Sequence, residues 1–272
     1  MEAGGVICLN GEFVPAGEAV ISAVDQGVLY GVGLFETIRV AGGRPRLLDR
    51  HLSRLFASAG ELGLEVPFGQ EELAGMASRT AEENGMAGGG LRLTLTAGGA
   101  FSRPAVFITA RKSPYREDQY RTGIRAGFST IKRNNRSPLV RHKTLNYFEN
   151  IMARREAVAA GWDEAIFLNT SGDLAEGSVS NIFLVDRGKV ITPHLQSGLL
   201  PGITRRRVLE LCTSMQVPVK ERRVDPAELA RAEECFITNA LVGVMPLTRV
   251  GDIIIGSGAP GEVTRMIMAG LK

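Results

Sequence analysis

The sequence is poor in cysteine, a residue that often holds zinc or builds disulfide frameworks. Its three cysteines are Cys8, Cys212 and Cys235, which are odd in number and far apart. None of them stands in a paired zinc-binding spacing, and an odd number argues against a disulfide scaffold. We therefore expect reduced, mostly buried thiols and no metal site.

The chain also lacks a long apolar run and a strong excess of charge. Hydrophobic residues make up 44% and charged residues 22% of the 272 residues, and the net charge is +3. No apolar run approaches the roughly 20 residues that span a membrane, and Met1–Leu9 shows no secretory signal. These features predict a cytoplasmic protein that binds neither membrane nor nucleic acid. A substrate bearing carboxylates would suit its mildly positive charge.

Turn residues and alternating apolar positions predict strands and two helices in the first part of the chain. Asn10-Gly11, between Val6–Leu9 and Phe13-Val14, is typical of a tight hairpin because both residues tolerate positive φ. A strand over 34–40 precedes a helix that Asp49 could cap. Apolar residues at helical spacing in that helix are Leu52, Leu55, Phe56, Ala59 and Leu62.

A second helix is expected over 70–84, followed by a pair of strands. Leu91, Leu93 and Leu95 alternate with polar residues, which predicts a half-buried strand that pairs with 105–110. Arg92 could point inward, but an outward position on an edge strand is favoured. The polar stretch after it, interrupted by Pro114, predicts a boundary between domains 1–115 and 123–272, with a linker over 116–122.

In the second part, strands over 164–168, 181–185 and 235–238 alternate with helices over 204–215 and after Asp225-Pro226. Another helix follows Lys143 and ends at Gly161. Apolar residues on one side of this helix are expected to be buried: Phe148, Ile151, Met152, Val158 and Ala159.

Four segments carry candidate functional residues, and each also has an ordinary structural explanation. Lys143 precedes a helix, where a single lysine is usually solvated. A Pro-Gly turn before Ile203-Thr204 places backbone N–H groups and the positive end of a helix dipole together, as at a phosphate site or at a plain capped helix. Glu176 stands before a buried strand, where a carboxylate needs a partner unless it lies in a turn. The segment 236–246 ends a strand in small and polar residues, as beside a ligand or at any strand end.

Taken in order, these segments resemble the fold-type IV pyridoxal-phosphate enzymes, which include branched-chain aminotransferases, D-amino-acid aminotransferases and aminodeoxychorismate lyases. The resemblance covers nearly the whole chain through LNGEFVPAGEAVISAVDQGVLYGVGLFETIRV, LLDRHLSRL, HKTLNY, AEGSVSNIF, PGITR and ITNAL. It implies an α+β fold with a small N-terminal α/β domain and a larger C-terminal domain with a barrel-like sheet. It also implies pyridoxal 5'-phosphate at the domain junction, a homodimer, and a small-molecule substrate with amino and carboxylate groups.

The resemblance assigns the central chemistry to two residues. Lys143 matches the lysine that forms the Schiff base with the cofactor and then shuttles the proton, for which its amine must be partly desolvated. Glu176 matches the carboxylate that keeps the pyridine nitrogen protonated, which makes the ring a strong electron sink.

The resemblance also assigns the remaining cofactor contacts. Ile203 and Thr204 match the phosphate-binding pair, and Arg54 matches an arginine that reaches the same phosphate. The second phosphate-side turn matches Asn239-Ala240, where backbone N–H groups and the Asn amide would make the contact. Tyr147 is expected among the cofactor-binding residues.

Two features favour the lyase within this family. The segment TNALVGVMP is similar to a lyase pattern where aminotransferases tend to have Thr- or Ser-rich turns. The chain is also one residue shorter between Lys143 and Tyr147 than the branched-chain form, a shortening shared with D-amino-acid enzymes. We therefore expect a 4-amino-4-deoxychorismate lyase of folate synthesis, which eliminates pyruvate to give 4-aminobenzoate. The alternatives are an aminotransferase, branched-chain type first and D-amino-acid type second, and a non-catalytic protein that only binds the cofactor.

Substrate contacts are expected from Phe35, Arg39 and Arg103. Phe35 and Arg39 lie in LFETIRV, which fits both lyases and branched-chain aminotransferases, and Arg103 would replace an Arg-Gly that this chain lacks. No histidine stands near Arg103, which places the D-amino-acid type last. A basic run could recognise a dicarboxylate, with at most one member in the site: Lys132, Arg133, Arg136 and Arg141.

Overall fold

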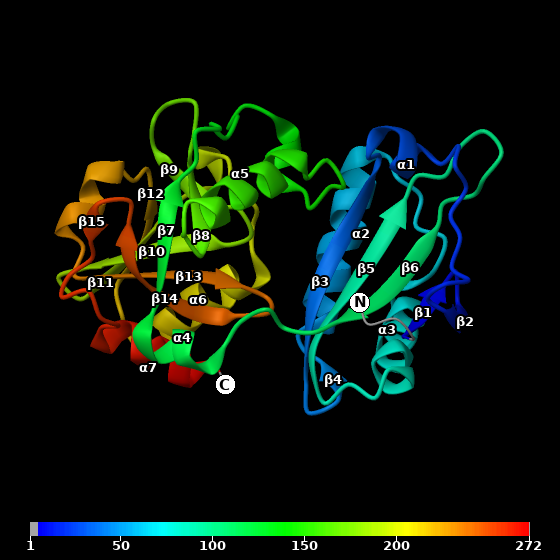
Figure 1. Cartoon of the computed structure of the whole chain (residues 1–272), viewed down its shortest axis with the longest axis horizontal. Helices are drawn as coiled ribbons and strands as arrows, with labels where there is room; N and C mark the ends of the chain where they lie inside the picture. The colour runs from blue at the N-terminus through cyan, green and yellow to red at the C-terminus, as the bar shows by residue number, and fades with distance from the viewer. Residues whose placement is uncertain (1–4, 272) are drawn as a thin grey trace. The chain divides into compact units, whose positions relative to one another are not determined.

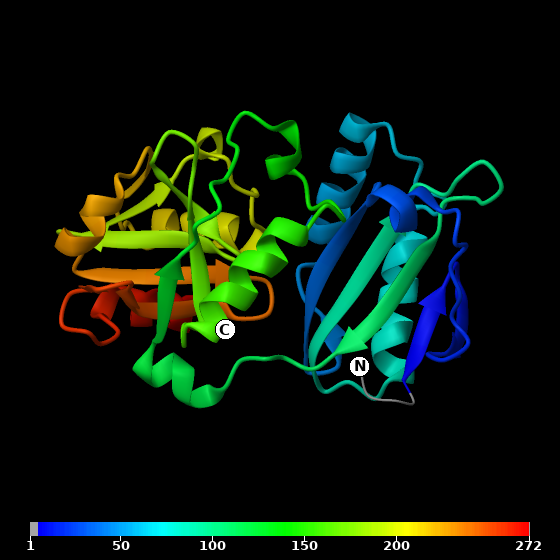
Figure 2. The ribbon, with the colours of Figure 1, turned by 45° about the horizontal axis from the view of Figure 1, so that its top comes forward.

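A computed structural model describes residues 5–271 (Figures 1 and 2), so the first four residues of the Met1–Leu9 segment lie outside it. The chain forms two compact units. Unit 1 contains the residues up to Pro114 together with His142–Asn146, and unit 2 contains Tyr115–Arg141 and the chain from Tyr147 onward. Residues 116–122, expected as a linker, contain helix α4 (Glu117–Thr122) of unit 2.

Unit 1 is built on a six-stranded antiparallel sheet in the order β2-β1-β6-β5-β3-β4. Its strands are β1 (Val6–Leu9), β2 (Glu12–Pro15), β3 (Gly33–Ala41), β4 (Arg44–Pro45), β5 (Gly88–Thr96) and β6 (Val106–Arg111), with the short helix α1 (Gln26–Tyr30) before β3. The predicted hairpin is confirmed. Asn10 and Gly11 connect β1 to β2 with φ of 51° and 90°, the positive values that such a turn requires.

Two helices cover one face of this sheet, α2 (Leu48–Leu62) and α3 (Gln70–Glu83), as Figures 1 and 2 show. Leu52, Leu55 and Ala59 of α2 are buried against it, as their spacing predicts. The predicted cap was wrong. The chain enters α2 through Leu47, which has a φ of 53° and makes no side-chain cap, so Asp49 already lies in the first turn.

The apolar face predicted for strand β5 is buried, but Thr94 and Thr96 on the other face are buried too, and β5 is not an edge strand. Leu91, Leu93 and Leu95 are fully buried beneath the helices, and β5 pairs with β3 on one side and β6 on the other. The expectation that Arg92 points outward from an edge was therefore wrong. The Arg92 guanidinium carbon lies 3.7 Å from the centroid of the Phe35 ring, on the sheet face away from the helices.

Unit 2 contains a nine-stranded mixed sheet whose two ends meet. Its path is β12-β11-β10-β13-β14-β7-β8-β9, with β15 paired to β14. The Leu174 N–H of β9 donates to the Val224 carbonyl just after β12, at 2.9 Å, so the sheet curls into a half-barrel. The strands are β7 (Ile124–Phe128), β8 (Glu164–Leu168), β9 (Leu174–Gly177), β10 (Asn181–Asp186), β11 (Lys189–Pro193), β12 (Val219–Arg222), β13 (Glu234–Asn239), β14 (Gly243–Val250) and β15 (Ile253–Ile254).

Both faces of this sheet are buried. Ile182 and Leu184 of β10 face one apolar cluster, whereas Phe183 and Val185 face another that includes residues of α6 (Ile203–Ser214) and α7 (Glu262–Gly270). The segment after Asp225 is the 3₁₀ helix η3 (Pro226–Arg231), and two more 3₁₀ turns are η1 (Pro138–Arg141) and η2 (Leu195–Ser197). The three cysteines are free and buried as expected, and burial raises the pKa of Cys212 to about 11.

Helix α5 (Phe148–Ala159) is present where the sequence predicts it, but its buried side is not the predicted one. The buried residues are Asn150, Ala153 and Ala157. The larger apolar residues are exposed, with exposed fractions of 68% for Phe148 and 57% for Val158. Small residues face the unit because α5 packs closely on the Ala165–Phe167 part of β8.

Between residues 5 and 271, no helix combines the length and the apolar character that crossing a membrane requires.

The tight packing around Gly33 gives a testable prediction for unit 1. A Cβ at Gly33 would overlap the Leu95 carbonyl of β5 and lie 2.7 Å from Leu145 Cδ1. Gly33→Ala should therefore lower the stability of unit 1 by about 1–3 kcal/mol, through overpacking. Thermal unfolding followed by circular dichroism measures this. Gly60→Ala in α2 is the control, because nothing lies within 4 Å of its added Cβ; equal melting temperatures for both variants would contradict the packing.

Candidate functional site

Lys143 and the helix α5 that follows it belong to different units. Lys143 lies in a strand-like segment of unit 1, whereas α5 lies in unit 2. The Phe35 N–H donates to the Lys143 carbonyl at 2.8 Å, and the Leu145 N–H donates to the Gly33 carbonyl at 3.0 Å. Between these two bonds, Thr144 forms an antiparallel β-bridge with Leu34. The backbone of Lys143 is thus fixed on both sides to the beginning of β3.

The Lys143 side chain is half-buried, and its Nζ lies 4.3 Å from the centroid of the buried Phe35 ring. Phe35 and Arg39 alternate onto the same face of β3, the face that also carries Arg92. The structure therefore places Phe35 beside Lys143, while the Arg39 side chain is exposed. Arg103 is exposed in the loop between β5 and β6.

Arg54 is held by a buried acid on the helix-covered side of unit 1. Its Nε donates to Glu36 Oε1 at 2.8 Å and its Nη2 donates to Glu36 Oε2 at 2.6 Å. His51, one helical turn before Arg54, places its Nδ1 2.7 Å from Glu36 Oε2. Burial by itself raises the pKa of Glu36, but the Arg54 charge and the hydrogen bonds from His51 and Arg54 outweigh it and lower this pKa to about 2.

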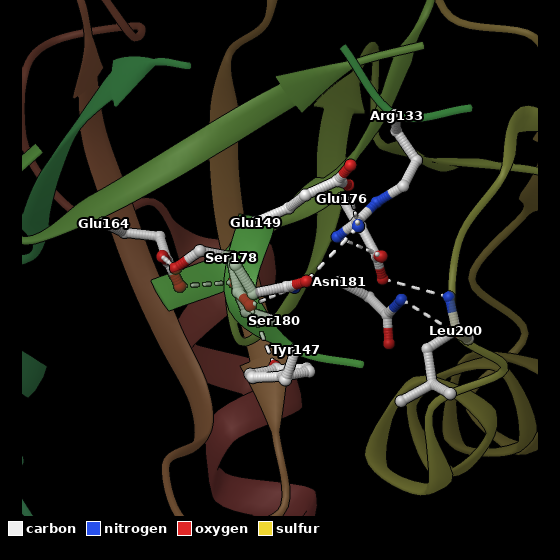
Figure 3. A network of polar contacts seen from close by, with 10 residues as sticks. Arg133, Tyr147, Glu149, Glu164, Glu176, Ser178, Ser180, Asn181 and Leu200 are labelled. Carbon is white, nitrogen blue, oxygen red and sulfur yellow. Dashed lines mark hydrogen bonds and ion pairs between the residues drawn. The ribbon is translucent and has the colours of Figure 1, made fainter. Parts of the chain in front are cut away.

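Glu176 lies on β9 in unit 2 and has a partner at each carboxylate oxygen (Figure 3). Oε1 lies 3.1 Å from Nη2 of Arg133, and Oε2 accepts the Leu200 N–H at 3.0 Å. Both side chains are nearly inaccessible to solvent, with exposed fractions of 9% for Glu176 and 8% for Arg133. The sequence places Glu176 just before a strand, but it lies within one, and its carboxylate has the partners that burial requires.

Arg133 is fixed in turn by its surroundings. Its Nη1 donates to Asn150 Oδ1 at 3.3 Å, and its guanidinium carbon lies 4.2 Å from the centroid of the Phe167 ring. Nη1 also lies 3.8 Å from Oε2 of Glu149. Of the four members of the basic run, Arg133 is the one that is buried, since Lys132, Arg136 and Arg141 are exposed. The local sequence gives no signal that separates these four residues.

Tyr147 helps to position the loop that follows Glu176. The Tyr147 hydroxyl donates to the Ser178 carbonyl at 2.9 Å, and Asn150 Nδ2 donates to the same oxygen at 2.7 Å (Figure 3). The Ser178 and Ser180 hydroxyls both donate to the buried Glu164 carboxylate. The predicted cofactor residues Tyr147 and Glu176 therefore belong to one connected polar network.

The Pro-Gly turn before α6 joins this network. Leu200, which donates its N–H to Glu176, accepts a bond from Asn181 Nδ2 at its carbonyl, at 2.9 Å. Gly202 is the N-cap of α6, and a Cβ there would overlap Asn181 Oδ1. Ile203 and Thr204 form the first turn, where the positive end of the helix dipole suits an anion. The structure thus brings Glu176 close to the predicted phosphate-binding turn.

Asn239 closes a second turn at the same end of the sheet, because β13 ends at Asn239 opposite the start of β10. Its Oδ1 accepts the N–H groups of Leu241 and Val242 at 3.0 and 2.9 Å. Its Nδ2 donates to the Tyr115 hydroxyl at 2.7 Å, and burial, with the Glu164 charge, raises the pKa of Tyr115 to about 12. The Asn239 amide thus shapes the turn that carries Ala240.

Two observations bear on whether this end of unit 2 could hold a phosphorylated cofactor. The Thr238 hydroxyl, beside the Asn239 turn, is buried and has no hydrogen-bond partner among residues 5–271. The N-terminus of α6 has Gly202 as its N-cap and no side-chain cap. A buried carboxylate, a helix N-terminus without a side-chain cap and an unpartnered hydroxyl fit a cofactor with a cationic ring nitrogen and a phosphate. Within that same range no cluster of His, Cys, Asp and Glu suits a metal ion.

Known proteins similar to this chain match it over nearly its full length. The sequence profile of the family described as amino-transferase class IV matches residues 33–250. The chain is 33% identical to a putative branched-chain-amino-acid aminotransferase of Methanocaldococcus jannaschii, over 98% of this chain and 95% of that protein. It is 32% identical to D-alanine aminotransferase of Bacillus licheniformis, over 98% and 95%, and 31% identical to aminodeoxychorismate lyase of Bacillus subtilis, over 95% and 91%.

Solved structures are similar over the same extent. The branched-chain amino acid aminotransferase of Escherichia coli superposes with a TM-score of 0.92 at 26% identity, covering 97% of this chain and 92% of that one. The T.th. branched-chain amino acid aminotransferase with pyridoxamine 5'-phosphate gives a TM-score of 0.91 at 30% identity, covering 98% and 93%. The expected α+β fold with a barrel-like sheet is confirmed.

The buried pair of Arg133 and Glu176 gives a prediction for unit 2. Arg133→Met should destabilise the protein by about 3 kcal/mol, because it leaves the Glu176 carboxylate buried without its cation. Urea unfolding followed by the fluorescence of Trp162, the single tryptophan, reports on this unit. Arg136→Met, at an exposed position of the same segment, is the matched control. If both variants unfold at the same urea concentration, the pair contributes nothing to stability.

Proposed function

Because the chain belongs to the amino-transferase class IV family, whose members are pyridoxal-phosphate enzymes, we propose that it is an aminodeoxychorismate lyase that eliminates pyruvate from 4-amino-4-deoxychorismate to give 4-aminobenzoate. The observation that favours a lyase rather than an aminotransferase is the turn in TNALVGVMP. In this turn the Asn239 side chain accepts hydrogen bonds from two backbone N–H groups and donates one to the Tyr115 hydroxyl. In an aminotransferase we expect a turn rich in hydroxyl groups at this place.

We assign the cofactor contacts to residues of both units. Glu176, with Arg133 and the Leu200 N–H beside it, would hold the protonated ring nitrogen, and Tyr147 supports the adjoining loop. The first turn of α6, Ile203 and Thr204, would bind the phosphate together with Arg54 and the Asn239-Ala240 turn. When bound, pyridoxal 5'-phosphate supplies an electron sink that lets a proton leave the substrate α-carbon.

Lys143 would take this proton from the α-carbon. Hydrogen bonds to β3 on both sides fix the backbone of Lys143, and its amine lies beside Phe35. A fixed backbone limits the positions that the amine can reach, and general acid–base catalysis requires a positioned group. The exposed Arg39 and Arg103 remain proposed contacts for the substrate carboxylates.

An amino-acid aminotransferase is the second candidate, and the comparisons favour it as strongly. Branched-chain and D-alanine aminotransferases are among the relatives at 32–33% identity, and the aminodeoxychorismate lyase stands at 31%. The two activities share the abstraction of the α-proton. They differ in the co-substrate, since an aminotransferase needs a keto acid to complete its cycle and a lyase needs none.

The deciding experiment is to add the purified holoprotein to enzymatically generated 4-amino-4-deoxychorismate without any keto acid. Repeated release of fluorescent 4-aminobenzoate would support the lyase. Absence of product would refute it. If the visible absorbance of the cofactor then changes with leucine, glutamate or D-alanine, the protein is an aminotransferase. A protein that gives neither response only binds the cofactor.

The assignment of Lys143 predicts the behaviour of one variant. Lys143→Ala should abolish turnover and the absorbance band that the covalent bond between Lys143 and the cofactor produces, because the amine that forms this bond and moves the proton is gone. Steady-state kinetics and an absorbance spectrum measure both effects. Lys132→Ala is the control, since Lys132 is exposed. Persisting turnover in the Lys143 variant would refute the assignment.

We further propose that the protein is a homodimer that covers the outer side of α5. Four apolar residues of this helix are exposed: Phe148, Ile151, Met152 and Val158. Helical spacing places these four residues on one side of α5, and exposed apolar residues gathered on one side of a helix are typical of a protein–protein contact. A second copy of the chain is the partner that the family leads us to expect.

A charge placed in this stripe should disrupt the dimer. Phe148→Glu should shift the mass in solution from two chains toward one, because a carboxylate would be buried in an apolar contact. Analytical ultracentrifugation at several protein concentrations measures the mass. Glu156→Gln, at an exposed polar position of α5 outside this apolar side, should leave it unchanged. A wild-type protein of one-chain mass, or a dimeric Phe148 variant, would contradict the proposal.

A further inference from the structure

Glu36, His51 and Arg54 form a buried cluster within unit 1. Glu36 lies on β3 and points toward α2, from which His51 and Arg54 approach it on successive turns. The exposed fractions of the side chains are 1% for Glu36, 3% for His51 and 12% for Arg54. Nothing assigned to the proposed reaction so far explains why an acid and a histidine are buried here.

Stability alone is a poor explanation for this cluster. Buried ion pairs often contribute no more than apolar residues of the same size, because removing the charges from water is costly. The acid also reduces the net positive charge around Arg54, the residue proposed to bind a phosphate dianion. If Arg54 binds a phosphate, Glu36 must therefore contribute something that outweighs this loss of positive charge.

The geometry indicates that Glu36 orients the Arg54 side chain. Two parallel hydrogen bonds, from Nε and Nη2 of Arg54 to the two oxygens of Glu36, fix both the plane and the position of the guanidinium. A side chain with many rotamers is thereby held in one arrangement before any ligand binds. Binding then loses less conformational entropy, and affinity rises without a new contact.

His51 holds the acid in place. Glu36 is ionised at neutral pH, since its pKa is lowered to about 2, so its oxygens only accept hydrogen bonds. Nδ1 of His51 must therefore carry the proton that it donates to Oε2, at 2.7 Å. Oε2 thus receives bonds from both His51 and Arg54, and rotation of the carboxylate would break both.

We propose that Glu36 and His51 are positioning residues that hold Arg54 ready for the phosphate group of the cofactor. This inference rests on the proposed function, which makes Arg54 a phosphate contact. Glu36 and His51 touch neither substrate nor cofactor in this proposal and act only through Arg54. Their loss should therefore weaken binding of a phosphorylated ligand and leave its unphosphorylated analogue unaffected.

The test compares pyridoxamine 5'-phosphate with pyridoxamine on the full-length apoprotein, with dissociation constants from isothermal titration calorimetry. Both ligands bind without a covalent bond to Lys143, so the ratio of the two constants isolates the phosphate contribution. Glu36→Gln should weaken binding of pyridoxamine 5'-phosphate by roughly tenfold, through lost preorganisation. It should change the constant for pyridoxamine by less than about twofold, since that ligand has no phosphate.

Further variants separate positioning from a structural role. Arg54→Ala should remove most of the preference for the phosphorylated ligand, and adding Glu36→Gln to it should have no further effect, because Glu36 acts through Arg54. Glu228→Gln is the matched control, since Glu228 forms the same two-bond contact with Arg222 in unit 2. It should leave both constants unchanged.

Three outcomes would overturn the inference: unchanged constants for Glu36→Gln, equal weakening of both ligands, or additive losses in the double variant. If Glu36→Gln fails to fold by circular dichroism, His51→Gln takes its place, with a smaller expected loss of about threefold for the phosphorylated ligand alone. An unchanged preference in Arg54→Ala would instead refute the proposed phosphate contact itself. That result is distinct from a failure of positioning, in which Arg54→Ala loses the preference and Glu36→Gln keeps it.

Discussion

The pairing of residues 143–145 with the beginning of β3 is the constraint on which the proposed chemistry depends. Two backbone hydrogen bonds fix Lys143 in unit 1, although the chain before and after this segment belongs to unit 2. Gly33 permits the close approach, because it lies between this segment and β5 and has no side chain. A mobile lysine could reach many positions; this one starts from a fixed backbone beside the Phe35 ring.

The two units hold their buried acids in the same way. Glu36 is held by Arg54 and His51, and Glu176 by Arg133 and the Leu200 N–H. In each case an arginine on a neighbouring element compensates the charge, and a second donor bonds to Oε2. Such an arrangement costs desolvation energy, and it provides charges whose orientation is set before a ligand arrives. The proposed roles of Glu176 and Arg54 both require this property.

Local patterns predicted the elements well where a single physical cause decides the structure. The Asn10-Gly11 turn requires positive φ, and leucines stand at every second position of β5 because that face is covered by helices. The same reasoning failed for α5, whose spacing identifies an apolar side without saying what covers it. Ala153 and Ala157 face unit 2 because close packing on β8 leaves room only for small side chains, so the large apolar residues lie outside.

The sequence by itself determined the family, through separated motifs around Lys143, Glu176, Arg54 and Ile203-Thr204, because several separated matches with consistent spacing are far more specific than one short pattern. Only the tertiary structure decided which side chains hold them. Lys132, Arg133, Arg136 and Arg141 are equivalent in the sequence, and Arg133 is distinguished by burial against Glu176, Asn150 and Phe167. Likewise, Arg92 lies on an interior strand because strand order is set by pairing across the sheet. Contacts between residues far apart along the chain leave no local pattern, so such partners emerge only when the chain is folded.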